Sequence, residues 1–246
     1  MASEFRYSTA HSIGRGCGVV AISQSGETAD TLAAVKEAKR RGAYAAAVVN
    51  VVGSSITRIC DDVAYTHSGP EIAVASTKAY IGQLVSIAKL AVETANAAGK
   101  LDRRRTGEYA SELANIGGKV KTILEANNIR GLAEDEANTQ TFFFVGRREN
   151  YPTALEGALK LKEISYVHAE GYAAGELKHG PLALMNEDVT VLALMPDDEL
   201  AGKMEANISE IKARGARVIS VGYGGDIKVP KTNPIFTPIL NIVPLQ

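Results

Sequence analysis

The sequence has few cysteines, no excess of charge of either sign and no long apolar run. Its only cysteines, Cys17 and Cys60, lack histidine or cysteine neighbours at metal-ligand spacing, which argues against a disulfide framework and against a zinc site. The 27 basic residues are balanced by 28 acidic residues, so no overall charge draws the chain toward nucleic acid or an anionic membrane. We therefore expect no metal, no nucleic acid and no membrane among its partners.

The apolar runs are short, and this sets further limits. None reaches the roughly 18 residues that a membrane-spanning helix needs. The opening residues, Met1 to Arg6, lack the apolar core of a signal peptide. With 246 residues, of which 46% are hydrophobic, the chain can fill the core of one large domain or of two small ones. These features predict a globular, cytoplasmic protein.

Short apolar runs alternate with helical patterns in two parts of the chain. In the first part the pattern predicts strands at 18–22, 44–49 and 63–66, and helices at 28–41 and 76–98. In the last part it predicts strands at 189–195 and 217–221, a helix at 199–214, and a further strand within 233–243. Such alternation is typical of an α/β fold with parallel sheets.

The two parts can be laid over each other. Arg41-Gly42-Ala43 aligns with Arg214-Gly215-Ala216, and the same offset aligns residues 19–22 with residues 192–195. A repeat of whole α/β units predicts two similar domains, although the common helix-glycine-strand connection can produce the same match. The polar stretch 101–131 between them predicts a connecting helical segment, whose basic run is a solvated helix face.

The hexapeptide Ser23-Gln24-Ser25-Gly26-Glu27-Thr28 stands between a predicted strand and a predicted helix. Hydroxyl groups, an amide and a glycine meet there at a helix N-terminus, where oriented N–H groups favour a phosphate. The loop lacks the pattern of nucleotide-binding loops, so a sugar phosphate fits better than a nucleoside triphosphate. Helix capping by Ser25 or Thr28 explains the same residues. The equivalent loop of the second part, Pro196 to Glu199, is acidic and should repel phosphate.

A second group of hydroxyls follows the turn at Gly69-Pro70. Ser76 and Thr77 stand at the start of the long predicted helix, where they either cap it or contact the same ligand. Both loops would lie at the carboxyl ends of parallel strands, which is where open α/β sheets bind ligands.

Acidic and basic side chains are concentrated between Glu156 and Pro181. Glu156, Lys160 and Glu163 stand at positions that share one helix face, and His179 follows in an expected loop. A carboxylate, an amine and an imidazole can together move protons on a small polar substrate. An ordinary surface ion pair also explains the helical residues.

Four stretches resemble a known family: Ala2–Tyr7, Ser23–Leu32, Val74–Ala79 and Tyr151–Leu184. Together they closely resemble the isomerase half of the glucosamine-6-phosphate synthase family, the glutamine:fructose-6-phosphate aminotransferases. The resemblance covers essentially the whole chain. The Ser23–Thr28 loop occurs widely among sugar isomerase (SIS) domains, whereas the stretch from Glu156 to Pro181 points to this family.

The resemblance implies a fold and an activity. It implies an α/β protein with two SIS domains, at 1–104 and 131–246, joined by a helical segment at 105–130. Each domain would be a five-stranded parallel sheet flanked by helices in three αβα layers. The activity implied is the conversion of fructose 6-phosphate and ammonia from glutamine to glucosamine 6-phosphate, without a metal or an organic cofactor.

The resemblance also implies roles for individual residues. The phosphate would be held by four residues of the loop, Ser23, Gln24, Ser25 and Thr28. The sugar site would be completed by Ser76 and the backbone near Val74 and Ala75. By similarity, Glu163 is the base that moves a proton between carbons 1 and 2, and Lys160 lies beside it. His179 assists ring opening in the site of a neighbouring subunit, which implies a homodimer.

Parts of the family pattern are missing from the sequence. They are the glutaminase domain expected upstream, the first strand and helix of the first SIS domain, and the last helix with a tail that carries a Schiff-base lysine. The resemblance therefore implies a fragment with both SIS domains incomplete, inactive or weakly active by itself. Within the enzyme class, a glucosamine-6-phosphate deaminase or a fructosamine-phosphate deglycase would share the loop. A sugar-phosphate-sensing SIS module would need the loop but neither Glu163 nor His179.

Overall fold

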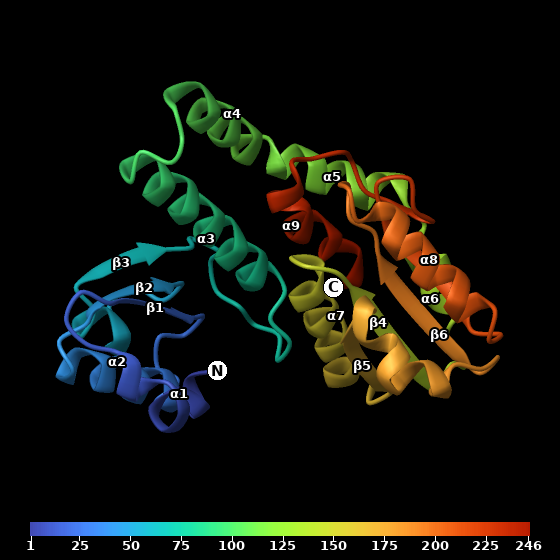
Figure 1. The fold of residues 1–246 in the computed structure, drawn as a ribbon, viewed down its shortest axis with the longest axis horizontal. Helices are drawn as coiled ribbons and strands as arrows, with labels where there is room; N and C mark the ends of the chain where they lie inside the picture. The colour runs from blue at the N-terminus through green and yellow to red at the C-terminus, as the bar shows by residue number, and fades with distance from the viewer. The chain divides into compact units, whose positions relative to one another are not determined.

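The computed structural model describes residues 1–246 and divides into two compact units, Met1–Ala95 and Asn96–Gln246 (Figure 1). Each unit holds one parallel β-sheet. The strand order is β1-β2-β3 in the first unit and β5-β4-β6-β7-β8 in the second. The predicted α/β class with parallel sheets is therefore confirmed.

The first unit builds its sheet from short runs of alanine and valine. Its elements are α1 (Ala2–Ser8), η1 (Ala10–Ser12), β1 (Gly18–Ser23), α2 (Ala29–Arg40), β2 (Tyr44–Val49), η2 (Ser55–Arg58), β3 (Asp62–Tyr65) and the start of α3 (Lys78–Ala97). The small core consists of alternate strand residues, which point to one face, together with Val35 of α2 and Ile56 of η2. All three strands are parallel, so their carboxyl ends lie at one edge of the sheet.

The second unit begins with helices and continues as a larger α/β sheet. Its elements are α4 (Arg103–Ala114), α5 (Ile116–Ala126), α6 (Ile129–Asp135), β4 (Thr141–Gly146), α7 (Asn150–Ser165), β5 (His168–Ala173), η3 (Ala174–His179), η4 (Pro181–Leu184), β6 (Val189–Leu194), α8 (Ala201–Lys212), β7 (Arg217–Gly222), β8 (Ile227–Lys228), η5 (Pro234–Phe236), α9 (Thr237–Asn241) and η6 (Val243–Leu245). Its five strands are the number that the resemblance implies for one domain, whereas the sheet of the first unit has three.

Alternation along the strands of the second unit puts helices on both faces of the sheet. Phe143 and Val145 of β4 belong to the core cluster that contains Met204 of α8. Phe144 points the other way, toward α7, where an added Cβ on Gly157 would lie 2.8 Å from its ring. The two helices thus cover opposite faces (Figure 1), and the three-layer arrangement is confirmed in this unit.

The repeat predicted from the sequence is present in the structure. β1, α2 and β2 form a strand-helix-strand unit with parallel strands, as do β6, α8 and β7. Each of these units pairs with one further parallel strand on the same side, β3 or β8. The shared Arg-Gly-Ala sequence marks the turn from helix to strand, and the glycine has a positive φ of 88° at Gly42 and 93° at Gly215.

Two sequence interpretations need correction. Residues 233–243 form no strand but two short helices, η5 and α9, followed by η6. Proline occupies the first turn of each, where its missing N–H costs nothing, and Asn233 caps η5 by accepting from the amide of Ile235. In addition, β4 and β5 were not anticipated. The buried run of β4, Thr141–Gly146, shows no alternating polarity, and β5 is rich in alanine and glycine, which favour strands little.

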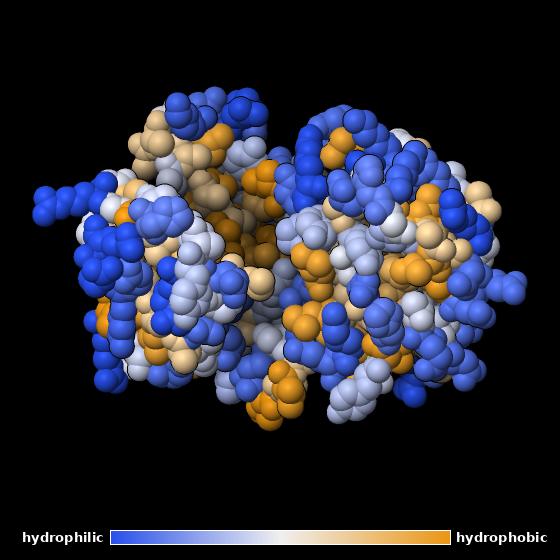
Figure 2. Space-filling view, turned by 60° about the horizontal axis from the view of Figure 1, so that its bottom comes forward, coloured by the Kyte–Doolittle hydropathy of each residue, from blue (hydrophilic) through white to orange (hydrophobic).

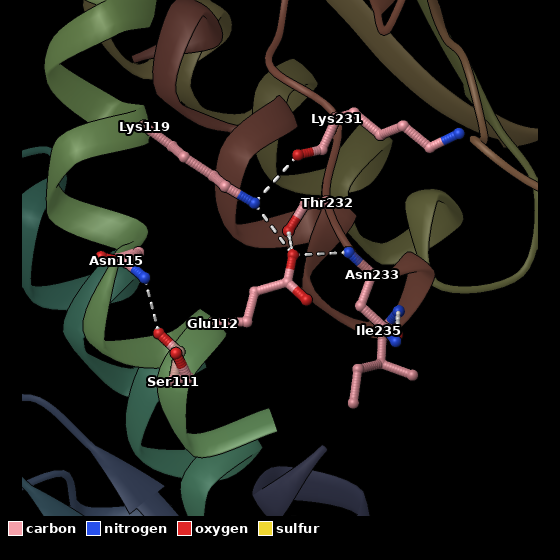
Figure 3. A network of polar contacts seen from close by, with 8 residues as sticks. All are labelled: Ser111, Glu112, Asn115, Lys119, Lys231, Thr232, Asn233 and Ile235. Carbon is pink, nitrogen blue, oxygen red and sulfur yellow. Dashed lines mark hydrogen bonds and ion pairs between the residues drawn. The ribbon is translucent and has the colours of Figure 1, made fainter. Parts of the chain in front are cut away.

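A half-buried carboxylate, that of Glu112, links the helices α4 and α5 to the loop that precedes η5 (Figure 3). Glu112 Oε1 accepts hydrogen bonds from Lys119 Nζ at 2.9 Å, from Thr232 Oγ1 at 2.6 Å and from the amide of Asn233 at 2.8 Å. Burial opposes ionisation of Glu112, but the hydrogen bonds from Thr232, Lys119 and Asn233 outweigh it and lower the pKa of the carboxyl group. The ionised form therefore stabilises the folded second unit.

Replacement of Glu112 by Gln is expected to lower the free energy of unfolding by about 1–3 kcal/mol at pH 7. Because folding lowers the pKa of Glu112, its contribution is complete above the unfolded value near 4.5 and is lost as the pH falls through the folded value. Urea unfolding of both proteins between pH 7 and pH 3 measures the difference. Glu108→Gln is the control, since Glu108 forms only an exposed ion pair with Arg104. Equal losses in the two variants would contradict the role of Glu112.

The visible surface of both units is largely hydrophilic, with hydrophobic residues scattered across it (Figure 2). No helix has the length and apolar character that crossing a membrane would require.

Candidate functional site

The Ser23–Thr28 loop lies at the carboxyl end of β1 and leads directly into α2. Ser23 is 6% exposed, and its Oγ accepts a hydrogen bond from the amide of Gly26 at 3.0 Å. The same oxygen is 3.2 Å from Thr28 Oγ1. The first N–H groups of α2 have no acceptor within the helix, so the loop presents hydroxyls and amides together.

Hydrogen bonds from neighbouring segments fix the backbone of this loop. Gln24 accepts from the amide of Asn50 at 3.1 Å, and Gly26 accepts from the amide of Ile56, also at 3.1 Å. Glu27 Oε1 accepts from the amide of Ser55 at 2.7 Å, and hydrogen bonds from Ser55 lower the pKa of this carboxyl group. The loop is therefore held in one shape before any ligand arrives.

Helix capping does not account for the hydroxyl groups of the loop. Thr28 is the N-cap residue of α2, but its side chain makes no capping hydrogen bond and points to Ser23 instead. Ser25 Oγ accepts from the amide of Glu27 at 3.2 Å within the loop. The capping alternative therefore lacks its hydrogen bond in the structure.

A different residue caps the long helix α3. Glu71 Oε2 accepts a hydrogen bond from the amide of Ala79 at 3.0 Å and another from Ser76 Oγ at 3.2 Å. Ser76 therefore donates to the capping carboxylate and is not itself the cap. Val74 is fully exposed, whereas Ala75 is buried. The sequence analysis missed Glu71, because it stands well before the start of α3 at Lys78 and outside the usual capping position.

The predicted acid–base helix is α7, and its three charged residues do come together. Lys160 Nζ lies 2.5 Å from Glu163 Oε2 and 3.6 Å from Glu156 Oε1. Lys160 is 4% exposed, while the side chain of Glu163 is 35% exposed. Burial raises the pKa of Glu156, and the neighbouring Lys160 works against this rise. This is more than a surface ion pair, because the lysine is buried and only Glu163 faces outward.

His179 lies far from this cluster within the same unit. α7 starts after the carboxyl end of β4 and runs back to the start of β5, so Glu163 lies near the amino ends of the strands. His179 follows β5 at the carboxyl ends, and a six-residue strand spans about 20 Å. Glu163 and His179 of one chain therefore lie toward opposite ends of the sheet. The sequence alone could not show this separation.

His179 is the exposed last residue of η3, which other residues anchor firmly. Leu177 is fully buried in the core cluster beside α8. Lys178 Nζ forms an ion pair with Glu210 Oε1 of α8 at 2.8 Å. The anchored segment therefore exposes the imidazole of His179 to solvent. The next residue, Gly180, has a φ of 143°.

The second unit has no counterpart of the Ser23–Thr28 loop. The loop after β6 is acidic, as the sequence analysis predicts, and its carboxylates are engaged internally. Arg148 forms ion pairs with Asp198, at 3.1 Å, and with Glu199, while Lys231 lies 3.8 Å from Asp197. No three His, Cys, Asp or Glu side chains gather in either unit as metal ligands would.

Comparison with known proteins agrees with this geometry. The SIS domain family matches two segments, residues 1–93 and 137–223, which contain the whole first sheet and β4 to β7 of the second. The chain belongs to the SIS domain family. Each matched segment carries one copy of the repeated strand-helix-strand unit, which explains why the two parts of the sequence can be laid over each other.

Individual SIS proteins match the whole chain. It is 48% identical to the glutamine–fructose-6-phosphate aminotransferases [isomerizing] of Clostridium tetani and of Thermococcus kodakarensis, over 100% of this chain and 42% of each relative. Among solved structures, the C-terminal domain of glucosamine-fructose-6-phosphate aminotransferase from Francisella tularensis has a TM-score of 0.93 and 38% identity, covering 99% of this chain and 72% of that one. A glucosamine-6-phosphate deaminase from Thermotoga maritima has a TM-score of 0.74 and 25% identity, covering 100% and 72%. The chain thus spans about two fifths of the aminotransferase relatives' length.

Proposed function

We propose that this chain is the sugar-phosphate isomerase part of a glutamine:fructose-6-phosphate aminotransferase. The observation that carries the proposal is the match of the entire chain, at 48% identity, to enzymes of that name. The remaining length of such an enzyme would hold the glutaminase domain that supplies ammonia. The reaction joins isomerisation of fructose 6-phosphate to its amination, giving glucosamine 6-phosphate, and needs no metal or organic cofactor.

The first unit would bind the phosphate of the sugar. Ser23, Gln24, Ser25 and Thr28 stand in a loop whose backbone is already fixed, at the N-terminus of α2. A phosphate dianion there would accept hydrogen bonds from hydroxyls and amides and would gain from the helix dipole. Ser76 and the backbone near Val74 and Ala75 would contribute to the sugar part of the site.

The second unit would supply the acid–base groups. After ammonia has condensed with the ketone at carbon 2 and water has left, Glu163 would take a proton from carbon 1 and return it to carbon 2, so that the imine passes through an enolamine to the 2-amino aldose. Without ammonia, the same removal of a proton from carbon 1 would give an enediol. Its ion pair with buried Lys160 fixes the direction in which its carboxylate points. Glu156 also lies beside Lys160, so two carboxylates, those of Glu156 and Glu163, share the ammonium group of this lysine.

His179 would act in the site of a second subunit. Within one chain the sheet separates it from Glu163 by the length of a strand, and it is exposed on a well-anchored segment. An imidazole can carry a proton to or from the ring oxygen when the sugar ring opens. This role requires a homodimer in which each subunit lends His179 to its neighbour.

Binding of fructose 6-phosphate tests the proposed site. Thr28→Val removes one hydroxyl group from the loop and keeps the shape of the side chain. We expect the affinity for fructose 6-phosphate to fall about tenfold or more, because the lost hydrogen bond is made to a charged group. Calorimetric titration measures the change, and Thr31→Val on the same helix, outside the loop, is the control. An unchanged affinity in Thr28→Val, or no binding by the unmodified chain, would reject the site.

A deaminase is the second candidate, because the structure of glucosamine-6-phosphate deaminase also matches the whole chain. Such an enzyme would use the same phosphate loop and would release ammonia from glucosamine 6-phosphate. Incubation with glucosamine 6-phosphate and, separately, with fructose 6-phosphate and ammonia distinguishes the two directions. Ammonia release from glucosamine 6-phosphate without any amination would favour the deaminase.

A further inference from the structure

An open hollow of about 590 Å³ lies at the carboxyl edge of the first sheet. It is lined by residues that follow β1, β2 and β3, namely Gln24, Asn50, Val51, His67, Gly69, Pro70 and Glu71. This edge is where open α/β sheets bind their ligands, and the volume is in the range of small-molecule sites. Gln24 belongs both to the hollow and to the candidate phosphate loop.

Asn50 fixes the shape of the segment that follows β3 and lines the hollow. Its Nδ2 donates to the carbonyl of Gly69 at 2.6 Å, and its Oδ1 accepts from Thr66 Oγ1 at 3.0 Å and from the amide of Ser68 at 2.9 Å. One side chain therefore ties the segment from Thr66 to Gly69 to the end of β2. These hydrogen bonds engage both polar atoms of the Asn50 side chain. Other groups of the hollow must therefore recognise a ligand.

His67 sits within this tied segment in an unusual conformation. Its φ is 52°, a left-handed value that few residues other than glycine adopt. The imidazole is exposed and makes a ring contact with Tyr65, with 6.1 Å between ring centroids. Its nitrogen atoms make no hydrogen bond with the protein. A loop that holds an uncommon backbone conformation, and that lines a hollow with an imidazole free of hydrogen bonds to the protein, is suited to a ligand.

We propose that His67 binds hydroxyl groups of the sugar part of a phosphorylated sugar whose phosphate lies in the Ser23–Thr28 loop. The inference rests on the proposed function and adds a residue to its site. The imidazole of His67, the amide of Gln24 and the carboxylate of Glu71 are groups that exchange hydrogen bonds with hydroxyls. The carboxylate of Glu71 in the same hollow disfavours a second phosphate there.

Replacement of His67 by Asn tests the proposal. Asparagine tolerates the left-handed conformation, so the loop is retained while the imidazole is lost. We expect the affinity for fructose 6-phosphate to fall about 3- to 10-fold, the effect of one or two hydrogen bonds, and the affinity for inorganic phosphate to stay unchanged. Calorimetric titration measures both ligands. His11→Asn, which changes a histidine of η1 outside the hollow, is the matched control.

The outcomes are distinct. A loss confined to fructose 6-phosphate supports the proposal, whereas unchanged affinity for both ligands overturns it. An equal loss for both ligands also overturns it, because His67 would then support the phosphate loop instead of contacting the sugar. If the unmodified chain binds neither ligand, the proposed function itself fails. His67→Gly, which also accommodates the backbone, replaces the asparagine variant if that variant does not fold.

Discussion

Replacement of Glu163 by Gln is expected to abolish the exchange of the carbon 1 proton of fructose 6-phosphate with solvent. Glutamine keeps the size of the side chain but cannot accept a proton, and loss of a general base costs about 10²- to 10⁴-fold in rate. Incubation of fructose 6-phosphate with the protein in deuterated water, followed by NMR at carbon 1, measures the exchange. The ion pair with Lys160 would be lost as well, so unfolding by urea is measured in parallel.

Glu149→Gln is the matched control for this experiment. Glu149 is exposed and precedes the start of α7, whereas Glu163 lies near the end of the helix, so the change removes a carboxylate from the same helix without touching the Lys160 cluster. We expect this variant to exchange the proton at the rate of the unmodified protein. Exchange that survives Glu163→Gln, or that is absent from the unmodified protein, would remove Glu163 from the role of base.

Gly26→Ala is expected to disrupt the Ser23–Thr28 loop and to lower the affinity for fructose 6-phosphate by more than about tenfold. Gly26 has a φ of 69°, and an added Cβ would lie 2.7 Å from Ser54 Cβ and 2.9 Å from Ile56 Cγ2. Both the backbone and the side chain would therefore be strained, at a cost of about 1–3 kcal/mol in the free energy of unfolding. Calorimetric titration and urea unfolding measure the two effects.

Gly16→Ala separates the two causes of strain. Gly16 also has a positive φ, of 85°, but an added Cβ there would have no neighbour within 4 Å. We expect this control to lose some stability through its backbone and to keep its full affinity for fructose 6-phosphate. If the two variants lost the same affinity, the close approach of Gly26 to Ser54 would have no part in forming the loop.

Much of the candidate site follows from local sequence patterns. The spacing of Glu156, Lys160 and Glu163 places them on one helix face wherever α7 packs, because helix geometry relates residues three and four positions apart. Likewise, a strand followed by Ser23–Thr28 and a helix places hydroxyls at a helix N-terminus. The structure confirms both local arrangements. The roles of these residues in binding and catalysis remain predictions, which the variants above test.

Other features depend on residues distant in sequence. Glu71 caps α3, and Asn50 shapes the loop around His67, through contacts that no local pattern encodes. The prediction of a strand within 233–243 was wrong, because a short apolar run is compatible with a strand and with a buried helix alike. In the structure, prolines occupy the first turns of short helices there. For the same reason β4, buried on both faces, carried no alternating signal.

The sequence by itself determined the α/β class, the internal repeat, the family resemblance and the makeup of the two chemistry-bearing segments. These properties depend on composition and on spacings of a few residues, which the chain carries wherever it folds. Only the tertiary structure decided that Lys160 is buried while Glu163 faces outward, and that Glu163 and His179 lie toward opposite ends of one sheet. Burial and distance are set by which strands pair and which helix faces pack, and contacts between distant residues fix both.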